Sequence, residues 1–421
     1  MTTGKPGKHA LAFILITVFL DVVGLGIIIP VLPQLLVELS GEPLHEAVLY
    51  GGWLIFLYAR MQFLCSPIIG NLSDRFGRRP VILLALGAYS IDYLIMGFAP
   101  TLALLFLGRA ISGITGASFT PANAYVADIT PAEKRAANFG LIGSMWGLAF
   151  IVGPVLGGLL GEIGTRVPFF FAAGLAALNL LYGYFALPET LPSEKRRPFH
   201  FATAHPIGTF QAMRAFPLVF WLLVAIVLFQ FAHDVSPTTW AYYTMHKFSW
   251  SPKDVGLSLA AVGVGIALVM SLGSRFITPR IGEERAAYAG FFASTVSFLG
   301  YALVPEGWMV FVFIPLGSFI GLSLPALRAI MSNAMPADRQ GALQGAMTSV
   351  IMLVAIFSPL LWTHVFGYFS SPGAAVYFPG AAYVMGSALL FACALSVRAV
   401  LKRFGPRAMS AAAETKEKAP A

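Results

Sequence analysis

The sequence has few charged residues and almost no cysteine. Only 11% of its 421 residues are Asp, Glu, Lys or Arg, and two are Cys. Soluble domains average about 25% charged residues, so this chain lacks the charge needed to cover a water-facing surface. Disordered chains are poor in aromatic residues, whereas 13% of this chain is aromatic. The composition therefore excludes soluble and disordered proteins.

The cysteines, glycines and prolines form none of the motifs typical of disulfide-rich, metal-binding or collagen-like proteins. Cys65 and Cys393 lie in apolar runs, so the sequence offers no disulfide framework and no CxxC metal site. The 42 Gly and 28 Pro follow no Gly-X-Y period, which excludes collagen. With 57% hydrophobic residues, the chain is predicted to be an all-α polytopic membrane protein. No cofactor and no metal are expected.

Twelve apolar runs are each long enough to span a bilayer, which takes about 20 residues. We expect spans at 11–32, 49–70, 80–98, 102–124, 138–160, 168–187, 217–241, 254–274, 286–304, 308–331, 342–365 and 375–397. A long polar stretch separates the sixth span from the seventh. The predicted organisation is an N-terminal six-helix bundle (1–187), a cytoplasmic linker (188–216), a C-terminal six-helix bundle (217–400) and a cytoplasmic tail (401–421).

The basic residues gather on one side of these spans. If the N-terminus is cytoplasmic, 21 of the 27 Lys and Arg lie on the cytoplasmic side and three lie in outside loops. This distribution follows the positive-inside rule. We therefore expect both termini in the cytoplasm and a multi-pass protein of the cell inner (plasma) membrane. The net charge of +8 then reflects topology, and no nucleic-acid partner is expected.

Short segments recur in the two halves at a constant offset. Pro131-Ala-Glu-Lys-Arg corresponds to Pro336-Ala-Asp-Arg-Gln 205 residues later, and a Gly follows each Pro by nine residues. The same offset places Pro154 on Pro359. Generic loop chemistry is the alternative explanation. Duplicated halves around a midplane site are typical of secondary transporters, and the absence of HExxH, GxSxG and P-loop motifs argues against an enzyme.

A basic segment between the second and third spans is the most distinctive motif. It reads Gly70-Asn-Leu-Ser-Asp74-Arg75-Phe-Gly77-Arg78-Arg79-Pro80. We expect a tight turn with two glycines, in which Asp74 accepts hydrogen bonds from helix N-terminal amides or pairs with an arginine. Either contact would hold two helices together and form a conformational latch. A loop that only sets topology is the simpler alternative.

This segment and two others resemble the major facilitator superfamily. Leu107-Gly108-Arg109-Ala-Ile-Ser-Gly113 is similar to the fourth-span motif of proton-driven members. Gly147-Leu-Ala-Phe-Ile-Val-Gly153-Pro154-Val-Leu-Gly157-Gly158 is similar to the fifth-span motif of exporters. Gly and Pro there allow helices to approach closely and to bend.

Further segments resemble the tetracycline/proton antiporter family. They are Leu20-Asp21-Val-Val-Gly24-Leu-Gly26, Tyr58-Ala-Arg-Met-Gln62, Ile91-Asp92-Tyr93-Leu94 and Gly341-Ala-Leu-Gln344-Gly345. The resemblance implies two pseudo-symmetric six-helix bundles and proton-coupled export of a small amphipathic compound by alternating access. It also implies a monomer in the lipid bilayer whose partners are protons and a small-molecule substrate. The family's second-half histidine and aspartate are replaced here by Ile266 and Ser294, which leaves the substrate open.

Charged residues inside the spans are the candidate proton and substrate site, because a charge at the bilayer centre costs about 2.5–3.5 kcal/mol. Asp21 is either a protonatable or substrate-binding carboxylate or a partner in an interhelical hydrogen bond. Asp92 and Arg109 lie in adjacent antiparallel spans and are expected to face each other, as a switchable ion pair or a permanent one. The family resemblance favours Arg109 for proton coupling.

The remaining polar candidates lie in the second, seventh and tenth spans. Arg60 is about 15 Å deep in its span and is expected to pair with Asp21 or to contact an anionic substrate group. Gln62 is expected to donate hydrogen bonds in the cavity. His233 and Asp234 either replace the missing coupling groups of the second half or form a polar cap.

Two functions are compatible with these residues. The first is a drug exporter coupled to protons through the charges described above. The second is a permease for an anionic metabolite or siderophore, in which Arg60 and Arg328 supply positive charge. Arg328 lies near the end of its span, where its side chain is expected to snorkel.

Overall fold

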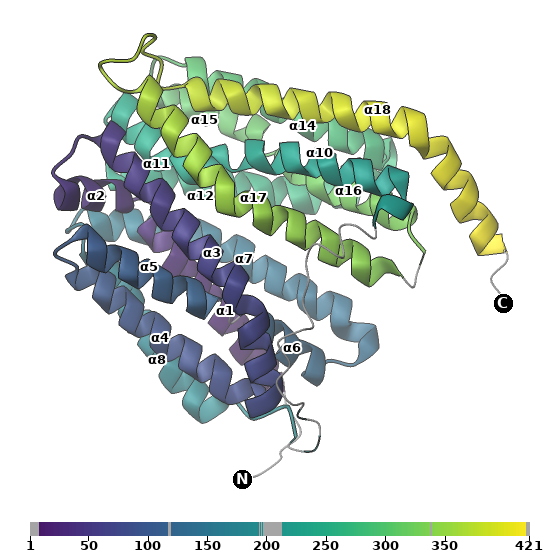
Figure 1. Cartoon of the computed structure of the whole chain (residues 1–421), viewed down its shortest axis with the longest axis horizontal. Helices are drawn as coiled ribbons and strands as arrows, with labels where there is room; N and C mark the ends of the chain where they lie inside the picture. The colour runs from purple at the N-terminus through teal and green to yellow at the C-terminus, as the bar shows by residue number, and fades with distance from the viewer. Residues whose placement is uncertain are drawn as a thin grey trace. The chain divides into compact units, whose positions relative to one another are not determined.

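The computed structural model describes residues 8–116, 119–192, 194, 196, 213–336 and 339–417. Within these ranges the chain is helical and contains no β-strand. Twelve helical stretches are long and apolar enough to cross a membrane. The predicted all-α architecture with twelve spans is therefore confirmed, and Figure 1 shows its helices.

The chain divides into two compact units. Unit 1 comprises Met1–Ala204 with Thr244–Gly263, and unit 2 comprises His205–Tyr243 with Val264–Ala421. The helices of the first half are α1 (Lys8–Ile28), α2 (Leu32–Ser40), α3 (Leu44–Phe76), α4 (Arg78–Phe98), α5 (Leu102–Gly116), α6 (Phe119–Ile129), α7 (Ala132–Gly161) and α8 (Val167–Ala186). Most of the predicted linker lies outside the described residues, so the predicted domain boundaries stay predictions.

The second half has a similar series of helices. They are η2 (Met213–Ala215), α10 (Pro217–His233), α11 (Val235–Phe248), α12 (Pro252–Leu272), η3 (Gly273–Ile277), α13 (Thr278–Ile281), α14 (Glu283–Leu303), α15 (Gly307–Gly317), α16 (Ile320–Asn333), α17 (Gln340–Phe369) and α18 (Ala381–Glu417). Helices α11 and α12 each contribute residues to both units.

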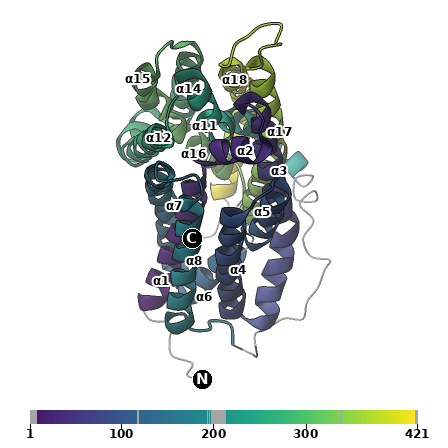
Figure 2. The same cartoon turned by 90° about the vertical axis from the view of Figure 1, so that its left-hand side faces the viewer.

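The same pattern of helix packing occurs in each unit. In unit 1, α1 packs on α7 and α8, and α4 packs on α8 and α5 (Figures 1 and 2). In unit 2, α10 packs on α17 and α18, and α14 packs on α18 and α15. Helices α4 and α14 both have 21 residues, and they begin 205 residues apart. The structure thus agrees with the internal repeat predicted from the sequence.

All twelve predicted spans are present, and some differ from the prediction in detail. The twelfth span begins at Ala381 rather than at 375, because the preceding Pro379 and Gly380 belong to a turn. The seventh span is not one continuous helix, since α10 ends at His233 and α11 begins at Val235. Pro237 accounts for this break, because it lacks the N–H that would bond the carbonyl four residues earlier.

Candidate functional site

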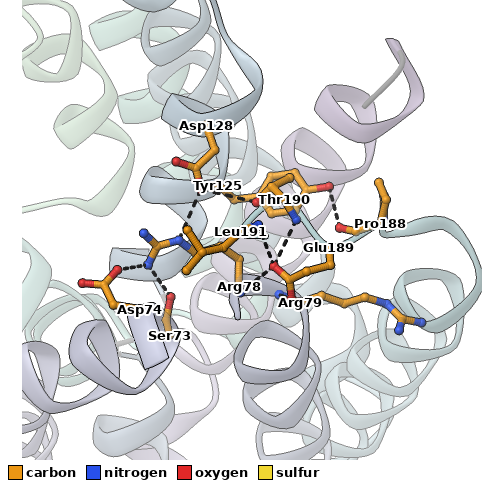
Figure 3. Close-up of polar contacts among 10 residues, drawn as sticks. All are labelled: Ser73, Asp74, Arg78, Arg79, Tyr125, Asp128, Pro188, Glu189, Thr190 and Leu191. Carbon is orange, nitrogen blue, oxygen red and sulfur yellow. Dashed lines mark hydrogen bonds and ion pairs between the residues drawn. The ribbon is translucent and has the colours of Figure 1, made fainter. Parts of the chain in front are cut away.

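Arg78 is the centre of the candidate latch in unit 1 (Figure 3). Its Nη1 lies 2.5 Å from Asp74 Oδ1 and donates a hydrogen bond to Ser73 Oγ at 2.6 Å. Its Nε donates to Asp128 Oδ2 at 3.3 Å. Asp74 belongs to α3 and Asp128 to α6, so one buried guanidinium joins α3, α4 and α6. Of the two roles left open for Asp74, the structure shows the pairing with arginine.

A carboxylate from beyond α8 occupies the N-terminus of α4. The backbone amides of Arg78 and Arg79 donate to Glu189 Oε1 at 2.9 Å and Oε2 at 3.3 Å. Because the first amides of a helix lack intrahelical partners and carry partial positive charge, Glu189 serves as the helix cap. Tyr125 supports this segment by donating to the Pro188 carbonyl at 3.1 Å. The sequence pattern did not reveal Glu189, which is 111 residues from Arg78.

The turn itself is shorter than predicted. Gly70 lies inside α3, which continues to Phe76, so the expectation that Gly70 belongs to the turn is wrong. Only Gly77 lies between the two helices, and its φ of 105° falls in the left-handed region that favours glycine. Arg79 donates to the Tyr184 carbonyl at 2.7 Å. Arg75 is exposed and lies over the Phe76 ring at 5.2 Å.

Asp92 is fully buried between α4 and α5. Its Oδ2 accepts a hydrogen bond from Ser112, and its Oδ1 has no hydrogen-bond partner among the described residues. As predicted, Asp92 faces the neighbouring span, but the expected ion pair with Arg109 is wrong, since the two form no ion pair within 4.0 Å. Gly108 and Ser112 share one face of α5, and Arg109 is rotated about 100° away from Gly108. Arg109 still interacts electrostatically with Asp92.

Three tyrosines of unit 1 interact with Asp21, and two of them, Tyr58 and Tyr93, also interact with Asp92. Asp21 is half-buried on α1 and interacts electrostatically with Tyr58, Tyr89 and Tyr93. The rings of Tyr89 and Tyr93 stack with centroids 6.2 Å apart. A Cβ on Gly24 would lie 2.6 Å from the Tyr93 hydroxyl, so this glycine brings α1 close to α4. The sequence did not mark these tyrosines as site residues, although Tyr89 and Tyr93 have the i, i+4 spacing of one helix face.

The other candidates in the spans have local contacts. Arg60 is exposed and stacks on Phe56 at 5.9 Å. Its predicted pairing with Asp21 is wrong, since the ion pairs found in the described residues do not include it. Gln62 Nε2 donates to the Gly116 carbonyl at 3.1 Å and thereby ties α3 to α5. Arg328 is exposed near the end of α16.

In the described part of unit 2, Asp234 is a buried carboxylate at the centre of a group of polar side chains. Asp234 Oδ1 accepts a hydrogen bond from Gln230 Nε2 at 2.7 Å, and Oδ2 accepts one from Ser358 Oγ at 2.5 Å. His233 Nδ1 is 3.4 Å from Asp234 Oδ1. Trp362 Nε1 donates to the Phe231 carbonyl at 2.8 Å, which adds a second bond between α17 and α10. Asp234 is therefore buried between two helices rather than capping an interface.

Known proteins share the whole of this architecture. The sequence profile described as "Major Facilitator Superfamily" matches residues 14–359. The chain is 39% identical to the tetracycline resistance protein, class C, of Escherichia coli, over 93% of this chain and 97% of that protein. It is 35% identical to the class B protein of Escherichia coli, over 95% and 98% of the two chains. This chain belongs to the Major Facilitator Superfamily.

The fold agrees with that membership. The crystal structure of the human organic anion transporter MFSD10 (TETRAN) superposes with a TM-score of 0.67 at 23% identity, over 94% of this chain and all of that chain. As a member of the Major Facilitator Superfamily, the chain is a multi-pass membrane transporter of small molecules, and not an enzyme. The family and fold predicted from the sequence are confirmed.

The fifth-span glycines of this transporter are packing positions. A Cβ on Gly153 would lie 2.9 Å from both Gly26 Cα and the Val23 carbonyl oxygen, and one on Gly157 would collide with the Ile27 carbonyl. On another face of α7, a Cβ on Gly158 would lie 2.6 Å from the Pro252 carbonyl oxygen. Pro154 lies between these faces, inside α7. The predicted close approach is present at all three glycines, whereas Gly147 faces open space.

Proposed function

We propose that this transporter is a proton-coupled antiporter that exports a small amphipathic compound of the tetracycline type. It acts as a monomer in the lipid bilayer of the inner membrane, with both termini in the cytoplasm. The relatives named as tetracycline resistance proteins support this substrate class, because the similarity extends over nearly their full length. The loss of the family's second-half histidine and aspartate, at Ile266 and Ser294, does not remove every carboxylate from unit 2.

The proposal rests on the burial and the hydrogen bonding of Asp92. A carboxylate that is 0% exposed, with one oxygen bonded to Ser112 and the other without a partner in the described chain, has an oxygen available for a proton. The charged form of Asp92 is attracted by Arg109, and protonation removes that attraction. Proton binding therefore changes the interaction between α4 and α5, which is the kind of differential contact that coupling requires.

Asp21 and its tyrosines form the polar wall next to Asp92. Tyr58, Tyr89 and Tyr93 come from α3 and α4 and interact electrostatically with Asp21 of α1. Aromatic faces and hydroxyls together suit an amphipathic compound, because they bind apolar surface and orient polar groups. We assign substrate binding to this wall and proton binding to Asp92 and Arg109. Gln62 positions α5 against α3.

Asp234 supplies the second half with its own titratable group. The carboxylate is 8% exposed and lies at the break between α10 and α11. Ionisable residues at interrupted spans are typical of transporter coupling sites. We assign Asp234, with His233, to proton binding in place of the groups missing at Ile266 and Ser294. The Asp74–Arg78 pair and the glycines of α7 are assigned to conformational control.

Transport into everted membrane vesicles tests the proposal. A respiratory proton gradient should drive tetracycline into vesicles that contain the full-length chain, and tetracycline should release protons when it is added. Asp92→Asn and Arg109→Gln should abolish this uptake at an unchanged protein level. Glu306→Gln is the matched control, because Glu306 lies in an exposed loop and its carboxylate accepts a hydrogen bond from its near neighbour Trp308 at 2.6 Å.

Two results would count against the proposed antiporter function. Full uptake by Asp92→Asn would reject the assignment of the proton to Asp92. Uptake of an organic anion without any tetracycline transport, together with its loss in Arg60→Gln, would favour the permease for an anionic metabolite or siderophore. The exposure of Arg60 on its helix predicts instead that Arg60→Gln transports normally.

A further inference from the structure

An apolar groove lies on unit 1 beside the turn at Gly77. Its volume is about 630 Å³, which is within the range of about 300–1,000 Å³ typical of ligand pockets. It is lined by three helices, and α5 packs against both α3 and α4. The lining residues include Ile69, Phe76, Leu84, Ala88, Ile114 and Thr115.

The groove extends from the turn into the span region. Phe76 is the last residue of α3, and the lining residues of α4 run from Pro80 to Ala88. The eight residue steps from Pro80 to Ala88 correspond to about 12 Å of helix. The one hydroxyl of the lining, on Thr115, donates to the Ser112 carbonyl at 3.1 Å. Over this length the groove therefore offers an occupant apolar surface only.

Arg75, at the open end, forms neither an ion pair nor a side-chain hydrogen bond among the described residues. Arg78 is engaged by Asp74 and Asp128, and Arg79 is bonded to the Tyr184 carbonyl. Arg75 is exposed, and its guanidinium lies 5.2 Å from the centre of the Phe76 ring, which lines the groove. A cation thus stands next to the mouth of an apolar groove in a membrane-spanning unit.

We propose that the groove binds one anionic phospholipid, with an acyl chain along α4 and the phosphate at Arg75. The apolar lining requires a hydrocarbon occupant, and the guanidinium favours a lipid that carries net negative charge. A cationic side chain near the membrane surface contributes about 1 kcal/mol to the binding of anionic lipid. A zwitterionic lipid fills the groove without this gain, and free phosphate lacks the hydrocarbon chain.

Native mass spectrometry of the full-length transporter tests this site. The protein is delipidated in detergent and titrated with phosphatidylglycerol or with phosphatidylcholine of the same chain length. The wild type should retain one phosphatidylglycerol with higher affinity than phosphatidylcholine. Arg75→Gln should weaken phosphatidylglycerol binding about fivefold, from the contribution of one arginine near the surface, and should leave phosphatidylcholine binding unchanged.

Two control variants distinguish lipid binding in the groove from general electrostatic attraction of the lipid to the protein. Arg275→Gln removes another exposed arginine that stacks on its neighbour Phe276, at 5.1 Å, and should bind phosphatidylglycerol as the wild type does. Ala88→Phe fills the groove and should weaken both lipids. The proposal is overturned if Arg75→Gln and Arg275→Gln behave alike, if Ala88→Phe binds normally, or if glycerol phosphate displaces the lipid.

Discussion

Asp234 and Ser358 bond at the point where two helices of unit 2 are both irregular. The Ser358 hydroxyl donates to Asp234 Oδ2 at 2.5 Å, Asp234 interrupts the seventh span, and Pro359 lies inside α17. In the internal repeat, Ser358-Pro359 corresponds to Gly153-Pro154 of α7. Unit 1 joins the corresponding helices by direct backbone packing of glycines, whereas unit 2 joins them through a carboxylate. The crossing in unit 2 therefore has an ionisable side chain at the contact, whereas the crossing in unit 1 is made by backbone atoms.

Loss of the Ser358 hydroxyl should loosen the crossing of α10 and α17. Interhelical hydrogen bonds in membrane proteins contribute about 0.6 kcal/mol on average and up to about 1.7 kcal/mol, and the burial of both groups places this bond towards the upper value. Ser358→Ala should therefore unfold more readily, as measured by thermal unfolding in detergent. Ser349→Ala is the control, because Ser349 bonds only the Gly345 carbonyl of its own helix. Equal stability of the two variants would show that the Asp234–Ser358 bond adds nothing.

Removal of the Glu189 carboxylate should weaken the N-terminus of α4. Glu189 accepts the amides of Arg78 and Arg79, and loss of a helix cap costs about 1 kcal/mol. Glu189→Ala should lower the thermal unfolding temperature, and Glu189→Gln should retain much of the wild-type value because its amide oxygen still accepts. Glu283→Ala, in the first turn of α14, serves as the comparison. Hydrogen exchange at the start of α4 would localise the effect, and unchanged exchange there would contradict the capping role.

The sequence predicts the spans well because each depends on local hydrophobicity. All twelve are present, as are Asp74 and Arg78 in contact at the turn. The contacts that the sequence does not predict join segments that are far apart along the chain. Glu189 reaches α4 across 111 residues, and nothing in its own neighbourhood marks it as a cap.

The predicted ion pair between Asp92 and Arg109 is absent for a different reason. Proximity of Asp92 and Arg109 follows from the order and direction of the spans, and the two do interact electrostatically. The hydrogen-bond partner depends on the rotation of α5 about its axis. Gly108 permits close approach, since a Cβ there would lie 3.0 Å from Asp92 Oδ1, and this rotation presents Ser112 instead of Arg109. Spacing alone does not determine that rotation.

A methyl group at Gly77 should be more costly than one at Gly282. The two glycines precede α4 and α14, are 205 residues apart, and have φ values of 105° and 82°. With ψ values of 157° and 162°, both positions lie in a backbone region that is essentially restricted to glycine, and it costs a side chain about 1–3 kcal/mol at either position. At Gly77 the added Cβ also collides with the Glu189 carboxylate, whereas at Gly282 no atom lies within 4 Å. Gly77→Ala should therefore unfold at a lower temperature than Gly282→Ala, and the opposite order would contradict the Glu189 contact.

A side chain at Gly157 should separate α7 from α1. Its Cβ would collide with the Ile27 carbonyl, which belongs to the backbone and cannot rotate away. Overpacking of this kind costs about 1–3 kcal/mol, so Gly157→Ala should be less stable and should transport poorly. Gly147→Ala, on the same helix but with open space around the new methyl group, should match the wild type in thermal unfolding. Because both substitutions have the same effect on helix propensity, a difference between them measures the contact with α1, and equal stability would exclude it.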